Sequence, residues 1–445
     1  MQVWKKPFII QKEEPPLKII DNIKKTIGDA SRYLAAFAKW TIISLFIGIL
    51  GGSVGSLFHI SIDAATEYRG GHTWLIFLLP VGALIITLLY RLCKRFGKLG
   101  TDRVLEALKT DSNLPAIMAP LIIVSTVITH FFGGSAGREG AALQLGGSMG
   151  YTVGKIIKLN SSDRHIIVMT GMSAVFASLF GTPLTAAIFA IEVTFVGMSC
   201  YAALLPCTIS AICGAKVAAA FGISPVAFGS DVTYKTTPGL LVRSAVLAFL
   251  CAIISIVFCY TIRYFSKGSK KLIPNPYIRA AAGGTIVAIL SLAVGCYDYN
   301  GAGMDIISDA LQGNCVPYAF ALKLIFTAVT IAAGFKGGEI VPAFFVGSTF
   351  GCTVGPLLGL DAPLAAQIGF VALFCGVVNC PVASLILALE VFGAENIPIF
   401  ALICSISYMM SGKTGLYKSQ TIVYSKISDD LSDFEVVHDR HETST

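Results

Sequence analysis

Long runs of apolar residues, separated by short polar or glycine-rich stretches, dominate this chain. About ten of the runs are long enough to cross or deeply enter a bilayer, for which a helix needs about 20 residues. In chain order, the helices expected from them cover residues 33–62, 74–92, 116–132, 139–153, 163–180, 183–196, 201–221, 240–265, 280–294, a short 304–311, 319–334 and further segments up to 410. The pattern predicts an all-α polytopic membrane protein.

The composition supports this prediction. The chain has 445 residues, of which 55% are hydrophobic and 13% charged, and its mean hydropathy is +0.75. A soluble protein carries about 25% charged residues. The 44 glycines suit closely packed membrane helices. The 12 cysteines lie mostly inside apolar runs and show no metal-ligand spacing, so we interpret them as small buried side chains and expect neither metal nor cofactor.

Breaks in the apolar pattern divide the chain into five parts. Residues 1–30 are expected to form a polar cytoplasmic segment that ends in a short surface helix around 17–27. A polar, proline-containing linker at 223–239 separates the first membrane repeat from the second. The repeats cover residues 31–222 and 240–424, and residues 425–445 form an acidic cytoplasmic tail. We expect this tail to be disordered or loosely attached.

Positive charge marks the side of the membrane that each turn faces. The net charge of +7 comes from basic residues in the N-terminal segment, in 91–98 and in 263–271. By the positive-inside rule all three face the cytoplasm, which places both termini there and the protein in the cell membrane. Because the charge is scattered over turns that flank the membrane, nucleic-acid binding has little support. The N-terminus also lacks the apolar core and cleavage site of a secretory signal peptide.

One glycine-rich stretch organises the rest of the prediction. The sequence GGSAGREG at residues 133–140 lies between two apolar runs and carries Arg138 and Glu139, where burial in the membrane penalises both charges. Its glycines allow a tight turn and a close approach of main-chain N–H groups. The helix expected behind it presents unpaired N–H donors and a positive dipole end, which attract an anion.

An internal repeat links this stretch to a second one. The sequence PLTAAIFAIEV at 183–193 matches PVASLILALEV at 381–391, at an offset of 198 residues. Gly171 pairs with Gly369 at the same offset, and the glutamates at 139 and 339 pair at an offset of 200. Matched proline, glycine and glutamate positions indicate two related halves. Transporters built from repeats bind substrate where broken helices meet.

The charged residues in the two breaks are therefore candidates for transport chemistry. As an anion, Glu139 could occupy the same N–H cluster as the substrate and leave it when protonated, which would couple anion to proton movement. Arg138 fits a structural or field-setting role better than a ligand role. For Glu339 three readings stay open, a second proton site, a helix cap or a partner of Lys336, of which we favour the first.

Other polar residues have less specific interpretations. Glu192 and Glu390 end matched apolar helices, so a shared structural role is favoured over transport chemistry. Tyr417 begins the last segment, either as an interfacial anchor or as a hydroxyl donor to an anion. The scattered histidines show no ligand spacing and receive no role.

These motifs resemble those of the CLC family of chloride channels and anion/proton antiporters, over residues 30–424. The sequence GREG at 137–140 stands where the family has GREGP, with Glu139 in the place of its gating glutamate. The sequence GEIVP at 338–342 stands at GxFxP, and Tyr417 matches the anion-coordinating tyrosine. The resemblance implies a CLC-type fold of two inverted repeats with broken, tilted helices, and a homodimer with one pore in each subunit.

Several positions depart from the family pattern. Ala141 replaces the proline after GREG, and Ile340 replaces the phenylalanine of GxFxP. The GSGIP motif is absent, and KLGT at 98–101 lies nearest to its expected place. Val193 stands where chloride/proton antiporters carry an inner proton glutamate. Together with the sequence GGE that ends at Glu339, these departures resemble the bacterial fluoride/proton antiporter branch, CLC-F.

The sequence thus predicts a membrane transporter of fluoride and protons. Glu139 would gate and carry protons, with Glu339 in support. The residues expected around the anion, mostly through main-chain N–H groups, are Gly137, Arg138, Gly140, Ala141, Ile340, Val341 and Tyr417. The alternative is a chloride channel or chloride/proton antiporter. An enzyme is not expected, because no nucleophile–base pair or phosphate loop is visible, and a membrane scaffold has no need of duplicated charged breaks.

Overall fold

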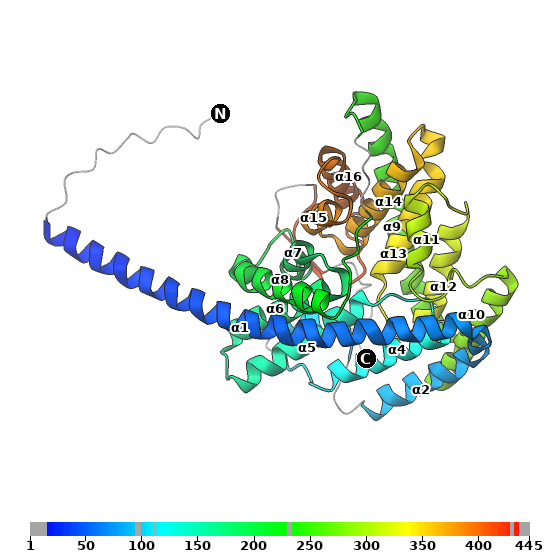
Figure 1. The fold of residues 1–445 in the computed structure, drawn as a ribbon, viewed down its shortest axis with the longest axis horizontal. Helices are drawn as coiled ribbons and strands as arrows, with labels where there is room; N and C mark the ends of the chain where they lie inside the picture. The colour runs from blue at the N-terminus through cyan, green and yellow to red at the C-terminus, as the bar shows by residue number, and fades with distance from the viewer. Residues whose placement is uncertain (1–15, 94–98, 111, 229–233, 428–430, 436–445) are drawn as a thin grey trace. The chain divides into compact units, whose positions relative to one another are not determined.

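The computed structural model describes residues 16–93, 99–110, 112–228, 234–427 and 431–435. The chain divides into two compact units, residues 1–43 and 44–445, and helix α1 (Pro16–Gly71) runs through the boundary (Figure 1). Several parts of the predicted segments lie outside the described residues: 1–15 of the N-terminal segment, 94–98 of the basic stretch at 91–98, 229–233 of the linker, and 428–430 and 436–445 of the tail.

The described residues are mainly helical, as the apolar pattern predicts. The helices of the first half after α1 are η1 (Thr73–Leu78), α2 (Leu79–Leu92), α3 (Thr101–Ala107), α4 (Met118–Phe132), α5 (Glu139–Ile156), α6 (Ser161–Phe180), α7 (Pro183–Glu192), η3 (Tyr201–Ala203) and α8 (Leu204–Ala220). Those of the second half are α9 (Pro238–Leu272), α10 (Pro276–Val294), α11 (Met304–Leu311), α12 (Ala319–Ala333), α13 (Ile340–Val354), η4 (Pro356–Leu358), α14 (Ala362–Val378), α15 (Pro381–Phe392) and α16 (Ile397–Met410).

Helices of two lengths make up the membrane part. In the described ranges, six helical segments are long and apolar enough to cross a membrane, and another six apolar helices are shorter, such as α7 and α12. Two of the short helices, which precede the two glycine-rich breaks, end at a glycine. Helix α4 ends at Gly133 with a φ of 92°, and α12 ends at Gly334 with a φ of 104°. Glycine adopts this left-handed conformation without the penalty that a side chain imposes.

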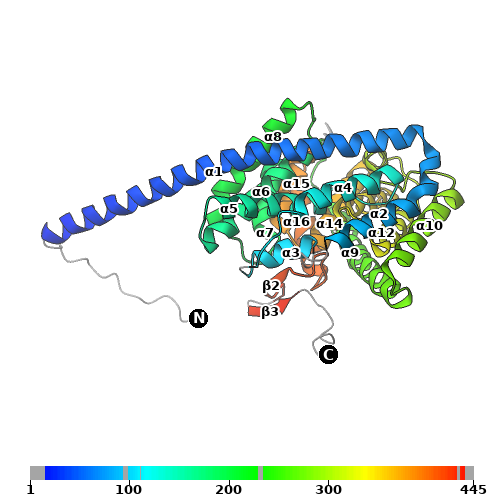
Figure 2. The same ribbon diagram turned by 90° about the horizontal axis from the view of Figure 1, so that it is seen from below.

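Two ends of the chain differ from the sequence-based expectation. The surface helix expected around 17–27 and the membrane helix expected from residue 33 are one continuous helix, α1, because no proline or helix-stopping turn separates them. After α16 the chain forms turns and then a strand. Strand β2 (Thr421–Tyr424) pairs in parallel with β1 (Phe195–Val196) and antiparallel with β3 (Leu431–Glu435). Part of the predicted loose tail is therefore hydrogen-bonded, and Figure 2 shows β2 and β3 below the helices.

The sequence repeat corresponds to a repeat in packing. Helix α5 packs on α6 through Gly146, whose added Cβ would lie 2.3 Å from the carbonyl oxygen of Gly171. Helix α13 packs on α14 through Gly347 in the same way, 2.3 Å from the carbonyl oxygen of Gly369. In both pairs only hydrogen fits between the helices, so the matched glycines of the two halves serve the same close contact.

The matched glutamates make reciprocal contacts between the halves. Glu192, at the end of α7, accepts hydrogen bonds from the N–H groups of Val382 (3.2 Å) and Ala383 (2.8 Å) in the first turn of α15. Glu390 of α15 in turn accepts from Leu184 and Thr185 (both 2.8 Å) in the first turn of α7. Each carboxylate thus caps the helix that carries the other, the structural role that the repeat favoured.

Candidate functional site

The two glycine-rich breaks meet in the structure. The N–H of Gly137 donates to the carbonyl of Gly338 and the N–H of Gly338 donates to the carbonyl of Gly137, both at 2.7 Å. This antiparallel bridge holds the first residues of α5 and α13 together. Two helix N-termini, one from each half, therefore direct their unpaired N–H donors at one small region.

Glu139 places its carboxylate among these donors. Its side chain is fully buried. Oε2 accepts hydrogen bonds from the N–H of Arg138 (3.0 Å) and from the N–H of Val341 in the first turn of α13 (3.2 Å). Oε1 has no hydrogen-bond partner in the part of the chain that the structure describes. The carboxylate thus occupies a site that is suited to an anion.

Gly338 makes this arrangement possible. A Cβ atom on Gly338 would lie 2.7 Å from the main-chain nitrogens of Glu139 and Gly140 and 2.8 Å from Oε2 of Glu139. Real Cβ atoms do not approach other atoms so closely. Glycine is needed here because the two main chains and the carboxylate share the same space.

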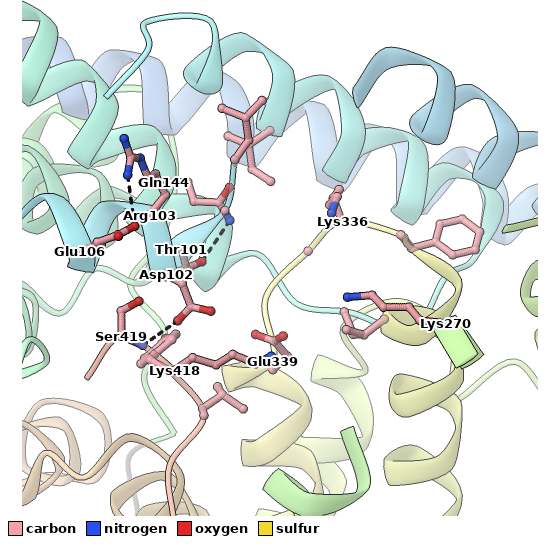
Figure 3. A pocket seen from close by; sticks show the side chains of 18 residues that line it. Thr101, Asp102, Arg103, Glu106, Gln144, Lys270, Lys336, Glu339, Lys418 and Ser419 are labelled. Carbon is pink, nitrogen blue, oxygen red and sulfur yellow. Dashed lines mark hydrogen bonds and ion pairs between the residues drawn. The ribbon is translucent and has the colours of Figure 1, made fainter. Parts of the chain in front are cut away.

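A cavity of about 640 Å³ lies on one side of the bridge. It is lined by Glu339, Tyr417 and Gly337, by polar residues of α3 and by Lys270 and Lys336. Figure 3 shows Glu339 between Asp102 on one side and the ammonium groups of Lys270 and Lys336 on the other. In this part of the structure, Lys336 and Glu339 do not form a direct ion pair; the Lys336 ammonium lies 4.4 Å from the ring centroid of Tyr90 instead.

Tyr417 contributes an unused hydroxyl to this cavity. The residue is 3% exposed, and among the described residues its hydroxyl has no hydrogen-bond partner. The chain around it is held at both ends, since the N–H of Leu416 donates to the carbonyl of Val377 (2.8 Å) and the N–H of Ser419 donates to Asp102 (3.1 Å). A buried donor held in this way is suited to an anion in the cavity.

Thr101 and Gln144 were not predicted as site residues. The hydroxyl of Thr101 donates to the carbonyl of Gly140 (3.2 Å), and Nε2 of Gln144 donates to Thr101 (3.0 Å) and to the same carbonyl (3.3 Å). Both line the 640 Å³ cavity, next to the place where the GSGIP serine is missing. The sequence signal was a polar residue one helical turn after Gly140 inside an apolar run.

Arg138 points away from that cavity. Its guanidinium lies 3.4 Å from the carboxylate of Asp63 and donates to the carbonyl of Leu179 (3.3 Å). These contacts place it at a second cavity, of about 470 Å³, which Val341 and His130 also line. The side chain of Arg138 thus has a structural partner in Asp63, the role that the sequence favoured, while its main-chain N–H donates a hydrogen bond to Glu139.

Apart from Arg138, the predicted residues divide into three groups. Gly137, Glu139, Gly140 and Val341 meet at the bridge, and Glu339 and Tyr417 share the 640 Å³ cavity. Ala141 and Ile340 are fully buried in the first turns of their helices and line neither of the two cavities. The two cavities share no lining residue, and Glu139 lies between segments that line each of them.

Comparison with known proteins agrees with this arrangement. Residues 81–412 match the family described as voltage gated chloride channel. The chain is 35% identical over 427 residues to the chloride/fluoride channel protein of Pseudomonas syringae pv. tomato, covering 93% of this chain and 94% of that protein. It is 26% identical over 393 residues to the H(+)/Cl(-) exchange transporter ClcA of Vibrio campbellii, covering 78% of this chain and 81% of that protein.

A solved structure is similar over most of the chain. The crystal structure of a CLC-type fluoride/proton antiporter superposes with a TM-score of 0.83 and 30% sequence identity, covering 86% of this chain and 98% of that one. The residues that match the family, 81–412, include both glycine-rich breaks.

Proposed function

Because the chain belongs to the voltage-gated chloride channel (CLC) family of membrane anion transporters, we propose that it is an antiporter that exports fluoride across the cell membrane in exchange for protons. The observation that carries this proposal is the buried carboxylate of Glu139 on N–H donors at the N-termini of α5 and α13. A carboxylate and a small anion compete for such donors.

Competition of this kind couples the two ions. While ionised, Glu139 accepts hydrogen bonds from the N–H groups of Arg138 and Val341. The substrate anion is then excluded from these donors. An anion that takes these donors repels the carboxylate, so Glu139 leaves as the neutral acid and carries one proton. When the anion departs, Glu139 releases the proton and returns. Each cycle then moves an anion one way and a proton the other.

The 640 Å³ cavity supplies the other groups that exchange requires. Glu339 lines it, and in this proposal Glu339 passes protons between the cavity and Glu139. The unpartnered hydroxyl of Tyr417 is a donor for the anion. Fluoride is small and strongly hydrated, so a site that binds it must replace water with close, strong hydrogen-bond donors. Main-chain N–H groups and a phenol hydroxyl are donors of this type.

Two sequence features favour fluoride over chloride. The serine of GSGIP is missing, with Thr101 and Gln144 in its neighbourhood, and Val193 stands where chloride/proton antiporters carry a glutamate. The second candidate function is chloride transport, as a channel or as a chloride/proton antiporter. It is favoured by the 26% identity to a protein named as an H(+)/Cl(-) exchange transporter.

The proposal extends to the architecture of the whole chain. The two repeats would comprise residues 31–222 and 240–424, joined by a linker at 223–239. Between them they would form one pore in each subunit of a homodimer, with residues 1–30, the tail at 425–445 and both termini in the cytoplasm. Partners would be fluoride or chloride, protons and membrane lipid.

Ion flux from proteoliposomes tests the function. Vesicles loaded with fluoride or with chloride are diluted into anion-free buffer at a clamped membrane potential, and anion efflux and external pH are recorded together. We expect fluoride to leave at least about tenfold faster than chloride, in line with a difference of more than about 1.4 kcal/mol in transition free energy, and protons to enter the vesicles. Faster chloride efflux, or fluoride efflux without proton movement, would contradict the proposal.

A further inference from the structure

A third cavity, of about 500 Å³, lies at the end of α2, the start of α10 and the turn after α12. Three of its nine lining residues, Arg91, Arg279 and Lys336, are cationic and none is acidic. None of the three forms an ion pair with a described carboxylate. A concave site with three positive charges and no negative one attracts an anion with several charged or polar oxygens.

The cations are held in place without being neutralised. The guanidinium of Arg91 lies 5.3 Å from the ring centroid of Tyr277, and the ammonium of Lys336 lies 4.4 Å from that of Tyr90. Arg279 donates from Nη1 to the carbonyl of Ile273 (3.0 Å), and its buried Nε has no partner among the described residues. Aromatic faces and a carbonyl orient these groups but leave N–H donors for a ligand.

The neighbouring sequence adds more positive charge. Lys270 and Lys271 stand in the last turn of α9, and four residues separate Lys271 from Pro276, where α10 begins. Basic clusters at the ends of membrane helices interact with anionic headgroups, and each cation near the surface contributes about 1 kcal/mol.

Apolar side chains continue from the cavity along the same two helices. Helix α2 packs against α10, and both belong to segments that are long and apolar enough to span a membrane. Leu88 of α2 is 48% exposed, and Ile278 and Ile289 of α10 are 58% and 57% exposed. A cationic cavity with an exposed apolar flank matches an amphiphile whose head is anionic and whose tails are acyl chains.

We propose that this cavity binds a phosphate group, supplied by the headgroup of an anionic phospholipid. The phosphate accepts hydrogen bonds from Arg91, Arg279 and Lys336, and the acyl chains lie along α2 and α10. The charged cavity alone would also accept free phosphate. The apolar flank favours the lipid, because free phosphate gains nothing from it.

Binding at this site has a consequence for transport. Lys336 lines both this cavity and the 640 Å³ cavity that contains Glu339. A phosphate that holds Lys336 offsets the positive charge facing Glu339. Anionic lipid would then change the transport rate, an effect that rests on the proposed function, whereas the binding site itself does not.

Lipid retention by the purified full chain tests the binding site. The protein is reconstituted in bilayers of phosphatidylcholine with phosphatidylglycerol, and bound phosphatidylglycerol is counted by native mass spectrometry. The test variant is Arg91→Gln/Arg279→Gln. The matched control is Lys155→Gln/Lys158→Gln, which removes two cations at the end of α5, and Arg91→Lys/Arg279→Lys keeps the charge. We expect retention to fall roughly thirtyfold in the test variant, since each cation contributes about fivefold.

The outcomes separate the two sources of phosphate. The lipid site is supported if the test variant loses phosphatidylglycerol while the two other variants retain it. Inorganic phosphate should then not displace the lipid from the wild type. Binding of inorganic phosphate with the same dependence on Arg91 and Arg279, without lipid retention, supports the phosphate site and assigns it to the free ion. Equal lipid retention in all variants, with no phosphate binding, overturns the proposal. If the double variant does not fold, Arg91→Gln alone is measured, with an expected fall of about fivefold.

Discussion

The carboxylate of Glu139 accepts a hydrogen bond from the N–H of Val341, 202 residues later in the chain and 3.2 Å away. The first residue of α5 thereby occupies the N-terminus of α13, the matched helix of the other half. Neither half alone provides the complete set of donors. The function we propose follows from this contact, because whatever displaces the carboxylate must bind where the halves meet.

Substitution of Gly338 by alanine should disrupt this contact. The added Cβ would collide with the main-chain nitrogens of Glu139 and Gly140 and with the Glu139 carboxylate, so the bridge between the breaks must open. We expect fluoride flux to fall by more than about tenfold, equivalent to about 1.4 kcal/mol. Flux is measured in proteoliposomes at equal protein content.

A matched control for this variant is Gly268→Ala. Gly268 lies in α9 with open space at its Cβ position, and alanine favours a helix. Flux through Gly268→Ala should equal that of the wild type. Equal flux through Gly338→Ala would show that the close approach of the two breaks is not needed for transport.

Substitution of Tyr417 by phenylalanine should weaken anion binding without loss of stability. Among the described residues its hydroxyl has no hydrogen-bond partner, so removing it breaks no bond in the anion-free protein. A lost hydrogen bond to the charged fluoride ion corresponds to roughly a ten- to hundredfold weaker apparent affinity. Fluoride titrations of flux, together with thermal unfolding, check both parts of this prediction.

Tyr318→Phe is the control, since Tyr318 is 59% exposed and does not line the 640 Å³ cavity. It should match the wild type in both measurements. Lower thermal stability of Tyr417→Phe with unchanged affinity would assign the hydroxyl a structural role, and the reading of Tyr417 as an anchor would be preferred.

Substitution of Glu390 by alanine should lower the stability of the protein and leave the coupling of fluoride to protons unchanged. Its carboxylate accepts three hydrogen bonds at the start of α7, including one from the hydroxyl of Thr185 (2.6 Å). Glu390→Ala removes this cap, which destabilises the protein by about 1–2 kcal/mol. The apparent unfolding temperature should fall relative to the exposed control Glu395→Ala, while the ratio of fluoride to protons stays the same. A changed ratio would instead place Glu390 in the transport pathway.

The features that could be predicted from the sequence either lie within one short stretch or recur in both halves. A glutamate among glycines between apolar runs was visible at 139, and the offset of 198 residues related Glu192 to Glu390 before their reciprocal contacts were known. Membrane burial makes such polar residues conspicuous. The same rule could have singled out Lys323, which is fully buried on α12 and donates to the carbonyls of Tyr299 (3.2 Å) and Gly301 (2.7 Å).

Features that the sequence did not reveal depend on distant contacts. Asp102 and Ser419 are 317 positions apart, and no periodicity relates the segment around Tyr417 to α3. The pairing of β2 with β1 likewise joins Phe195 to Thr421, 226 positions later in the chain. The contact of Thr101 with Gly140 also required the folded arrangement, since a threonine at a helix start carries no specific signal, whereas Gln144 was at least visible as a polar residue inside an apolar run.

Lys426 should make stability depend on pH. It lies outside the membrane helices, where its ammonium donates to the carbonyl of Tyr408 (2.8 Å), to Ser411 (3.0 Å) and to Asn379. Burial lowers the pKa of Lys426 to about 8 from 10.5. Between these values the unfolded chain binds more protons than the folded one, so this residue's contribution to stability rises as the pH increases from about 8 to 10.5.

The comparison variant is Lys426→Met, which cannot titrate. The difference in unfolding free energy between wild type and variant should shift in favour of the wild type by an amount on the order of 2 kcal/mol between pH 7.5 and pH 10.5. Thermal unfolding in detergent at the two pH values gives its direction. If the difference in stability between wild type and variant is the same at both pH values, the lowered pKa of Lys426 is contradicted.

Proton movement driven by fluoride in Glu139→Gln proteoliposomes tests the central claim most directly. Glutamine keeps the size of the side chain but neither competes as an anion nor carries a proton. Our account predicts that an outward fluoride gradient acidifies the lumen of vesicles with the wild type and with the exposed control Glu395→Gln, and leaves the pH unchanged with Glu139→Gln. Undiminished proton uptake through Glu139→Gln would contradict it, because the proton would then cross the membrane without this carboxylate.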